Sequence, residues 1–115
     1  MKREDVLAAA RRCVCSDREW DYGSPEDNFG IIADFWARYL QGRGAQLDLE
    51  PRDVAAMLAL LKLARVATGH AKADNWIDLA GYAACGGECQ MRTREEASVC
   101  IHPERIEKGG QRYAL

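Results

Sequence analysis

Hydrophobic residues recur along most of this chain at the three- and four-residue intervals of an α-helix, and strand-like alternation is nearly absent. A first amphipathic helix is predicted over about residues 3 to 15. The polar stretch at 16–23, which contains two aromatic residues, predicts a loop. We therefore expect an all-α protein with a fold like a four-helix bundle.

The segment after this loop has the features of a helix start. Ser24 is placed to act as N-cap, Pro25 suits the first helical position, and acids fill the first turn. Gly42 and Gly44 predict the end of this helix. The hydrophobic positions at helical spacing between these ends are Phe29, Ile32, Phe35, Trp36, Tyr39 and Leu40.

Two further helices follow. Pro51 predicts the start of the third and Gly69 its end, while the fourth is predicted to begin near Asp74 and to weaken at Gly86-Gly87. Beyond Cys89 the chain turns polar and loses its periodicity. We expect one domain over 1–89 and a tail over 90–115, either loosely ordered or packed on a neighbouring subunit.

The third helix is apolar on nearly all sides, which is typical of a helix in a core or between subunits. Lys62 lies near its middle and needs a compensating partner there, because an unpaired buried charge is unfavourable. Asp74 and Asp78 on the next helix are the predicted partners. Asp53 lies on nearly the opposite side of the third helix from Lys62, and we expect it to stabilise the N-terminus of this helix.

Asp74 and Asp78 stand one turn apart on one side of the fourth helix, so they suit a shared divalent cation such as Mg²⁺. Glu26 or Asp27 could face them and complete the site. Gly81 on the same side leaves room for a ligand to approach. The alternative interpretation has no metal: Asp74 and Asp78 form interhelical salt bridges with Lys62 and Arg65, and the acids near residue 26 serve as cap residues.

Composition narrows the function classes. The chain is 48% hydrophobic and 30% charged, with a formal net charge of −2, which is ordinary for a soluble domain. No basic patch dominates, so we expect no nucleic acid partner. The hydrophobic third helix is too short for a bilayer, so we expect no membrane association. Because the MKRED start has acids where a secretory signal needs an apolar core, we expect a cytoplasmic protein.

Five cysteines in a cytoplasmic chain favour reduced thiols, mostly small buried side chains on helices. A zinc site is the weaker alternative, since the spacing is loose compared with the tight pairs of known zinc motifs. Its ligands would be Cys85, Cys89, Cys100 and His102.

The order YG-x-PEDNF, an aromatic helix, DVAAMLALLKLAR and K-x-DNWIDLAGYAA resembles a group of small phage and prophage proteins. These are similar to the all-α MazG-like nucleoside triphosphate pyrophosphohydrolases. The resemblance covers about residues 3 to 89, and its most specific piece is Lys72 to Ala84. It implies a helical bundle that assembles from two or more chains, here a dimer or tetramer. It also implies Mg²⁺ held by acids on adjacent helices and hydrolysis between the α- and β-phosphates.

Two departures from the family pattern stand out. The family's ExxD motif falls on Asn75 and Asp78, so an amide replaces its first acid, and no EExxE motif precedes it. A site with fewer carboxylates would hold Mg²⁺ more weakly. Lys62 and Arg65 could instead grip the triphosphate directly.

We therefore expect a Mg²⁺-dependent homo-oligomer that converts a nucleoside triphosphate to a monophosphate and pyrophosphate. Lys62, Arg65 and Asp78 are the predicted catalytic residues, with Trp20, Tyr22 or Trp76 stacking on a base. The alternative is a catalytically silent bundle that serves as an interaction, regulatory or nucleotide-binding subunit during phage infection. The predicted metal ligands are Glu26, Asp27, Asp74 and Asp78, and the predicted substrate-binding residues are Tyr22, Asn28, Asn75 and Tyr82.

Overall fold

The computed structural model describes residues 1–17, 24–69 and 72–99, with side chains described up to residue 91. This part of the chain is all-helical and contains no β-strand, as the sequence predicts. Its elements in chain order are α1 (Arg3–Arg12), a π-helical turn η1 (Cys13–Asp17), α3 (Pro25–Gly42), α4 (Pro51–Ala67) and α5 (Ala73–Val99).

The predicted first helix is present, but its last turn differs from an α-helix. α1 ends at Arg12 and the backbone continues as the π-helical turn η1 to Asp17. Acids in the first turn and arginines in the last complement the helix dipole of α1. Ala10 is its buried residue, and α1 packs along α5.

The predicted start of α3 is confirmed. Ser24 Oγ accepts a hydrogen bond from the Asp27 backbone N–H at 3.4 Å, and Pro25 occupies the first turn. Serine in this position satisfies an amide that the helix itself leaves unpaired. The helix ends at Gly42, and Gly44 follows with a φ of 104°, a left-handed conformation that glycine adopts without strain.

The predicted ends of α4 are also confirmed. The helix starts at Pro51, and Asp53 Oδ2 accepts a hydrogen bond from the Glu50 backbone N–H at 2.8 Å. Asp53 therefore serves the helix N-terminus, as expected from its position. At the other end, Gly69 has a φ of 88° and its N–H donates to the Val66 carbonyl.

α5 does not weaken at its glycine pair, contrary to the sequence-based prediction. It continues through Gly86-Gly87 to Val99, so the predicted domain boundary at residue 89 falls inside the helix. A Cβ on Gly86 would lie 3.0 Å from the Ala55 Cβ, so the absence of a side chain lets α5 approach α4 closely. Residues 100–115 of the predicted tail lie outside the described part of the chain.

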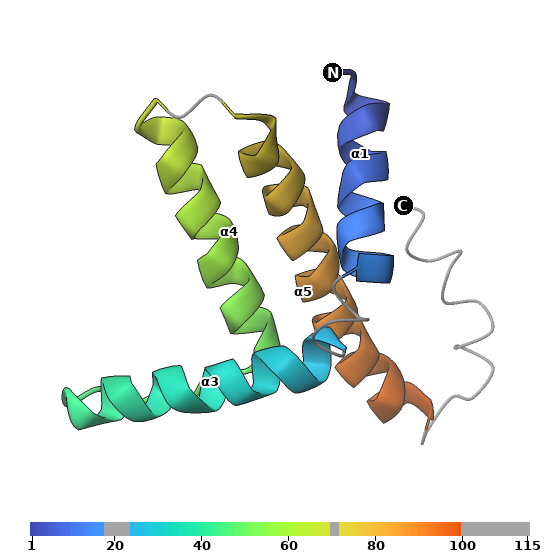
Figure 1. Ribbon diagram of the computed structural model, residues 1–115. Helices are drawn as coiled ribbons and strands as arrows, with labels where there is room; N and C mark the ends of the chain where they lie inside the picture. The colour runs from blue at the N-terminus through green and yellow to red at the C-terminus, as the bar shows by residue number, and fades with distance from the viewer. Residues whose placement is uncertain (18–23, 70–71, 100–115) are drawn as a thin grey trace.

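α5 is the central helix of the arrangement. It lies between α4 and α1, and α3 begins beside α5, passes the lower end of α4 and projects beyond it (Figure 1). The buried core at this crossing comprises Phe29, Ala33, Val54, Ala55 and Cys85. Half-buried hydrophobic side chains, including Trp36, Leu58 and Tyr82, pack around it. The described part of the chain thus contains four α-helices around a small core.

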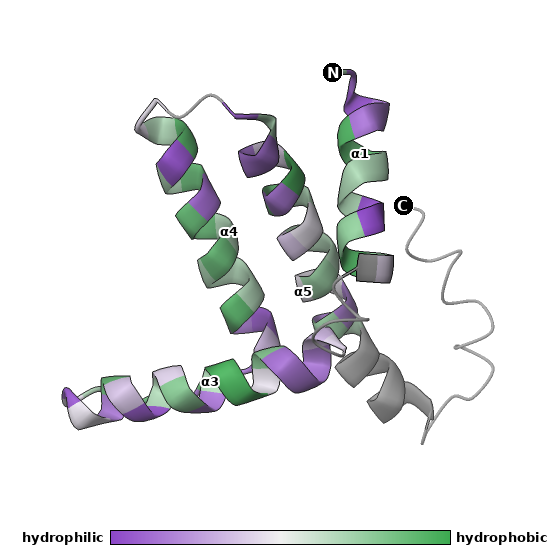
Figure 2. Cartoon of the chain, in the orientation of Figure 1, coloured by the Kyte–Doolittle hydropathy of each residue, from purple (hydrophilic) through white to green (hydrophobic). Residues whose placement is uncertain are grey.

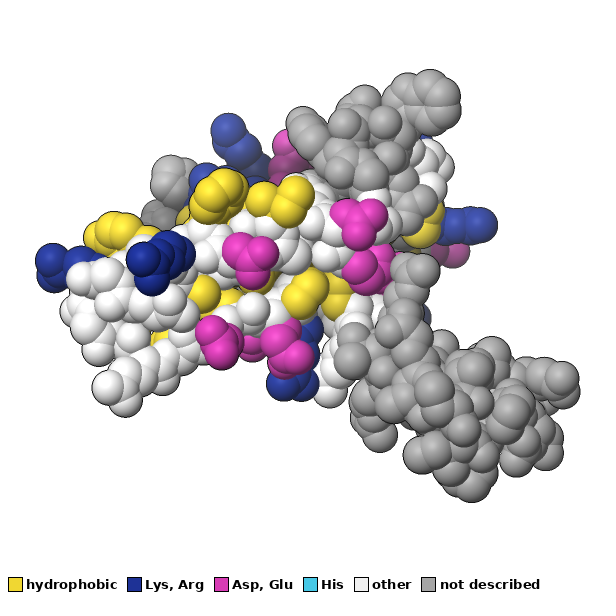
Figure 3. Space-filling view, turned by 90° about the horizontal axis from the view of Figure 1, so that it is seen from below, with side chains coloured by type: hydrophobic (Ala, Val, Ile, Leu, Met, Phe, Trp, Pro, Cys, Tyr) yellow, Lys and Arg dark blue, Asp and Glu magenta, His cyan; other side chains and the backbone are white. Residues whose placement is uncertain are grey.

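Many large hydrophobic side chains remain exposed. Hydrophobic residues occur on several sides of α4 (Figure 2), and Phe35 on α3 is 70% exposed. Seen from below, hydrophobic side chains and carboxylates share the surface (Figure 3).

No helix in the described part of the chain combines the length and apolar character required to cross a bilayer.

Candidate functional site

The predicted partnership between α4 and α5 is present. The Lys62 Nζ lies 2.8 Å from the Asp78 Oδ2, and the Lys62 side chain is 11% exposed while that of Asp78 is 38% exposed. The ion pair therefore has one buried member and one member that water reaches. A charge-assisted hydrogen bond of this length compensates the buried ammonium.

Asp78 belongs to a stripe on α5 that carries two of the predicted substrate-binding residues. Asn75, three residues earlier, is buried at 5% exposure, and Tyr82, four residues later, is half-buried against the core. Residues spaced three and four apart lie on one side of a helix. Asn75, Asp78 and Tyr82 therefore lie on one side of α5.

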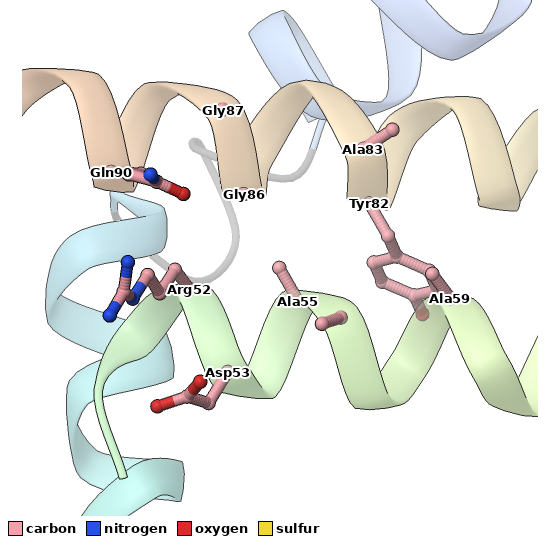
Figure 4. Close-up of a pocket in the computed structure, with 10 residues that line it drawn as sticks. Arg52, Asp53, Ala55, Ala59, Tyr82, Ala83, Gly86, Gly87 and Gln90 are labelled. Atoms are coloured by element: carbon pink, nitrogen blue, oxygen red, sulfur yellow. The ribbon is translucent and has the colours of Figure 1, made fainter.

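A cavity of about 420 Å³ adjoins this stripe between α4 and α5 (Figure 4). Its walls are mostly alanines and glycines of the two helices, and the Tyr82 ring projects from α5 toward Ala59 of α4. Arg52 and Gln90 lie at the opposite end. Lys62 and Asp78 are not among the residues that line the cavity, but each lies about one helical turn from one of them, Ala59 on α4 and Tyr82 on α5.

Arg52 and Gln90 were not predicted from the sequence. Arg52 also forms an ion pair with Glu50, 3.0 Å between Nη2 and Oε2, and it remains 48% exposed. Gln90 stands eight residues after Tyr82, which places it on the same side of an uninterrupted helix. The sequence-based prediction ends the helix near Gly86-Gly87, so it does not place Gln90 on the same helix face as Tyr82.

The four carboxylates predicted to hold Mg²⁺ do not come together within one chain. Throughout the described residues, no group of three or more histidine, cysteine, aspartate or glutamate side chains is placed to hold a metal ion. Asp74 and Asp27 are exposed, whereas both carboxylate oxygens of Glu26 are buried. Of the four predicted ligands, Asp78 is the one that the structure pairs with Lys62, and metal binding by these residues stays a prediction.

The other predicted site residues occupy mixed positions. Arg65 is exposed and forms no ion pair with a described residue, and Asn28 is half-buried on α3. Trp76, a predicted stacking residue, is 51% exposed. Trp20 and Tyr22 lie outside the residues that the structure describes.

Gly81 and the cysteines have structural positions. A Cβ on Gly81 would lie 3.0 Å from the Val14 Cγ1, so the space predicted for a ligand is filled by η1. Cys85 and Cys89 are buried on α5 and form no disulfide with another described residue. The remaining members of the alternative zinc set, Cys100 and His102, lie outside the described residues.

Comparison with known proteins assigns this chain to a family. The family described as "Domain of unknown function (DUF6378)" matches residues 5–90, which include most of α1, all of α3 and α4, and the ion pair. The chain belongs to the DUF6378 family. Its DUF6378 region therefore contains every described residue of the candidate site.

Curated relatives of this DUF6378 protein come from phages. The Gene 55 protein of Mycobacterium phage D29 is 37% identical over 83 residues, which is 71% of this chain and 51% of the relative. The Gene 55 protein of Mycobacterium phage L5 is 36% identical over 78 residues, 68% of this chain and 47% of the relative. The chain thus spans about half the length of these relatives. No solved structure matches it.

Proposed function

We propose that this DUF6378 protein binds a nucleoside triphosphate between α4 and α5 and hydrolyses it to a monophosphate and pyrophosphate. The observation that carries the proposal is the Lys62–Asp78 pair, which lies about one helical turn from two residues that line the 420 Å³ cavity. The Lys62 ammonium suits a phosphate group, and the water-accessible Asp78 carboxylate suits the metal ion that accompanies the phosphate. The resemblance to MazG-like pyrophosphohydrolases supports the same reaction class.

A single carboxylate fits the way proteins usually bind Mg²⁺. This ion commonly keeps several waters and takes one or two carboxylates together with the phosphates of the substrate, so a preformed group of acids is not required. Asp78, 38% exposed, would hold Mg²⁺ that arrives with the triphosphate. Bound there, Mg²⁺ would offset charge on the phosphates and polarise the attacking water.

The residues around the pair then take definite roles. The Lys62 ammonium donates a hydrogen bond to a phosphate oxygen and neutralises negative charge that builds there. Tyr82 offers its ring as a wall for the nucleoside in the cavity, whose volume lies within the range of small-molecule sites. Water forms a bond to the α-phosphorus, the bond from that phosphorus to the bridging oxygen breaks, and pyrophosphate leaves with the electron pair.

The test is pyrophosphate release from a panel of nucleoside triphosphates with Mg²⁺ or Mn²⁺. Lys62→Met should lower the rate at least about tenfold, because charge stabilisation by one positioned cation contributes on this scale. Lys72→Met is the matched control, since Lys72 is exposed and lies just before α5. Absence of pyrophosphate across the panel would refute the hydrolytic function.

One observation favours a second candidate, a catalytically silent interaction or regulatory subunit. The described residues hold no group of three acids of the kind the resembling enzymes use. Calorimetric titration separates the two candidates. An interaction subunit shows no Mg²⁺-dependent binding of a nucleotide, whereas the proposed enzyme binds one, and binds it more weakly after Asp78→Asn.

A further inference from the structure

The cavity between α4 and α5 has polar side chains at the end away from Lys62 and Asp78. Arg52 reaches this end from α4, and Gln90 reaches it from α5 (Figure 4). Arg52 stands ten residues before Lys62 and Gln90 twelve residues after Asp78, which corresponds to about 15 Å and about 18 Å of helix. A nucleotide whose phosphates lie at Lys62 and whose sugar passes Tyr82 therefore directs its base toward Arg52 and Gln90.

Arg52 offers a ligand hydrogen-bond donors and no acceptor. A guanidinium group carries five N–H groups and keeps its charge in a protein. The ion pair with Glu50 joins the Arg52 Nη2 to the Glu50 Oε2 at 3.0 Å, and the guanidinium has further N–H groups on its other nitrogens. Because the Arg52 side chain is 48% exposed, these groups are accessible to a molecule in the cavity.

Gln90 offers both kinds of hydrogen-bonding group, since its amide oxygen accepts and its amide nitrogen donates. The two side chains together present donors from α4 and an acceptor from α5 at one end of the cavity. Asp53 also lines the cavity, but its carboxylate points away from Gln90 (Figure 4), and its Oδ2 accepts the Glu50 backbone N–H at 2.8 Å. Asp53 therefore serves the start of α4 rather than a ligand beside Gln90.

We propose that Arg52 and Gln90 read the base of the bound nucleotide and select bases with a lactam edge, which is a carbonyl group next to a ring N–H. Guanine, uracil and thymine have this edge, whereas adenine and cytosine carry an amino group beside a ring nitrogen without hydrogen. Arg52 donates to the carbonyl oxygen, and the Gln90 Oε1 accepts the ring N–H. This inference rests on the proposed function, because phosphates at Lys62 orient the nucleotide.

Arg52 sets the selectivity and Gln90 supports it. The Gln90 amide can rotate to present its oxygen or its nitrogen, so it suits either kind of base. The Arg52 guanidinium cannot accept a hydrogen bond, so an amino group on the base places donor against donor and leaves polar groups unpaired. A site built to pair with one hydrogen-bonding pattern therefore rejects a base that presents the opposite pattern.

Two pairs of nucleotides isolate the edge of the base. Inosine and adenosine triphosphates are both purine nucleotides, and only the first has the lactam edge; uridine and cytidine triphosphates differ in the same way among pyrimidines. The test is calorimetric titration of the full chain with Mg²⁺ and the α,β-methylene analogues of these four, since that linkage resists hydrolysis. We expect dissociation constants at least about tenfold lower for the inosine and uridine analogues, because a well-placed pair of hydrogen bonds discriminates bases on this scale.

Arg52→Met should bring the two dissociation constants within each pair to within about threefold of each other, because the group that faces an amino base as a donor is gone. Gln90→Met should weaken all four analogues alike and keep the preference. Arg38→Met is the matched control, since Arg38 is an exposed arginine on α3 that does not line the cavity. Circular dichroism checks that each variant keeps its helices, and Arg52→Gln repeats the test if Arg52→Met does not fold.

A preference in both pairs that Arg52→Met abolishes and Arg38→Met preserves supports the inference. Equal binding of all four analogues overturns it and leaves the proposed function standing. An equal loss for all four in Arg52→Met also overturns it, because that result places Arg52 at the phosphates, and so does a preference that survives Arg52→Met. Failure of the proposed function has a different signature, in which no analogue binds or Lys62→Met leaves binding unchanged, and the inference then fails with it.

Discussion

Replacing Asp78 with asparagine removes the charge that compensates the buried Lys62 ammonium while nearly preserving the shape of the side chain. Breaking a fully buried ion pair by removing one partner destabilises a protein by about 3–5 kcal/mol. Here Asp78 is 38% exposed, so water reaches the pair and moderates the loss. We therefore expect Asp78→Asn to lower the free energy of unfolding by about 2 kcal/mol.

The opposite substitution should be milder. Lys62→Met keeps an unbranched stem in the same space, and the Asp78 carboxylate left behind retains contact with water. We expect a loss of about 0–1 kcal/mol. In the double variant, adding Asp78→Asn to Lys62→Met should cost under about 0.5 kcal/mol, because no buried ammonium remains to be left alone.

Urea unfolding followed by circular dichroism at one fixed protein concentration measures all four proteins of this cycle. We expect Asp78→Asn to lower the free energy of unfolding more than Lys62→Met does. Equal losses, or a larger loss for Lys62→Met, would show that Lys62 is not an ammonium whose burial depends on Asp78.

Three further predictions test other parts of the structure. Gly86→Ala should lower the free energy of unfolding by about 1–3 kcal/mol, because the new Cβ would press on α4. Gly87→Ala is the control: its Cβ meets nothing within 4 Å, so it should raise the free energy of unfolding by about 0.5–1 kcal/mol. Thermal unfolding compares the two variants. Ser24→Ala should lower the free energy of urea unfolding by about 0.5–2 kcal/mol through loss of the N-cap, and no change would argue against the bond. Cys13 is exposed and Cys85 is buried, so site-resolved mass spectrometry should find Cys13 alkylated quickly and Cys85 only under unfolding conditions; equal rates would contradict the packing of α5.

The ends of α3 and α4 and the central ion pair were accessible from the sequence because local chemistry determines them. Ser24 followed by Pro25 has few uses other than starting a helix. Lys62, alone in a hydrophobic stretch, required an acid, and the following helix offered two candidates. Choosing Asp78 over Asp74 needed the register between α4 and α5, which the sequence does not state.

The missed features all depend on how helices pack. Gly86 resembles a helix breaker in isolation, but in the structure it gives α5 close contact with Ala55. Gly81 similarly accommodates Val14 rather than a ligand. Glu26 was expected beside the acids of α5; it lies in the first turn of α3, and within the described residues no acid of α3 joins Asp78 in a group of three metal-binding side chains.

The most direct test of the proposed site is a crystal structure of the protein grown with Mg²⁺ and a non-hydrolysable nucleoside triphosphate. We expect phosphate oxygens in hydrogen-bond contact with the Lys62 Nζ, Mg²⁺ on the Asp78 carboxylate, and the nucleoside beside Tyr82. A nucleotide bound elsewhere on the chain, with Lys62 and Asp78 still paired only to each other, would contradict it.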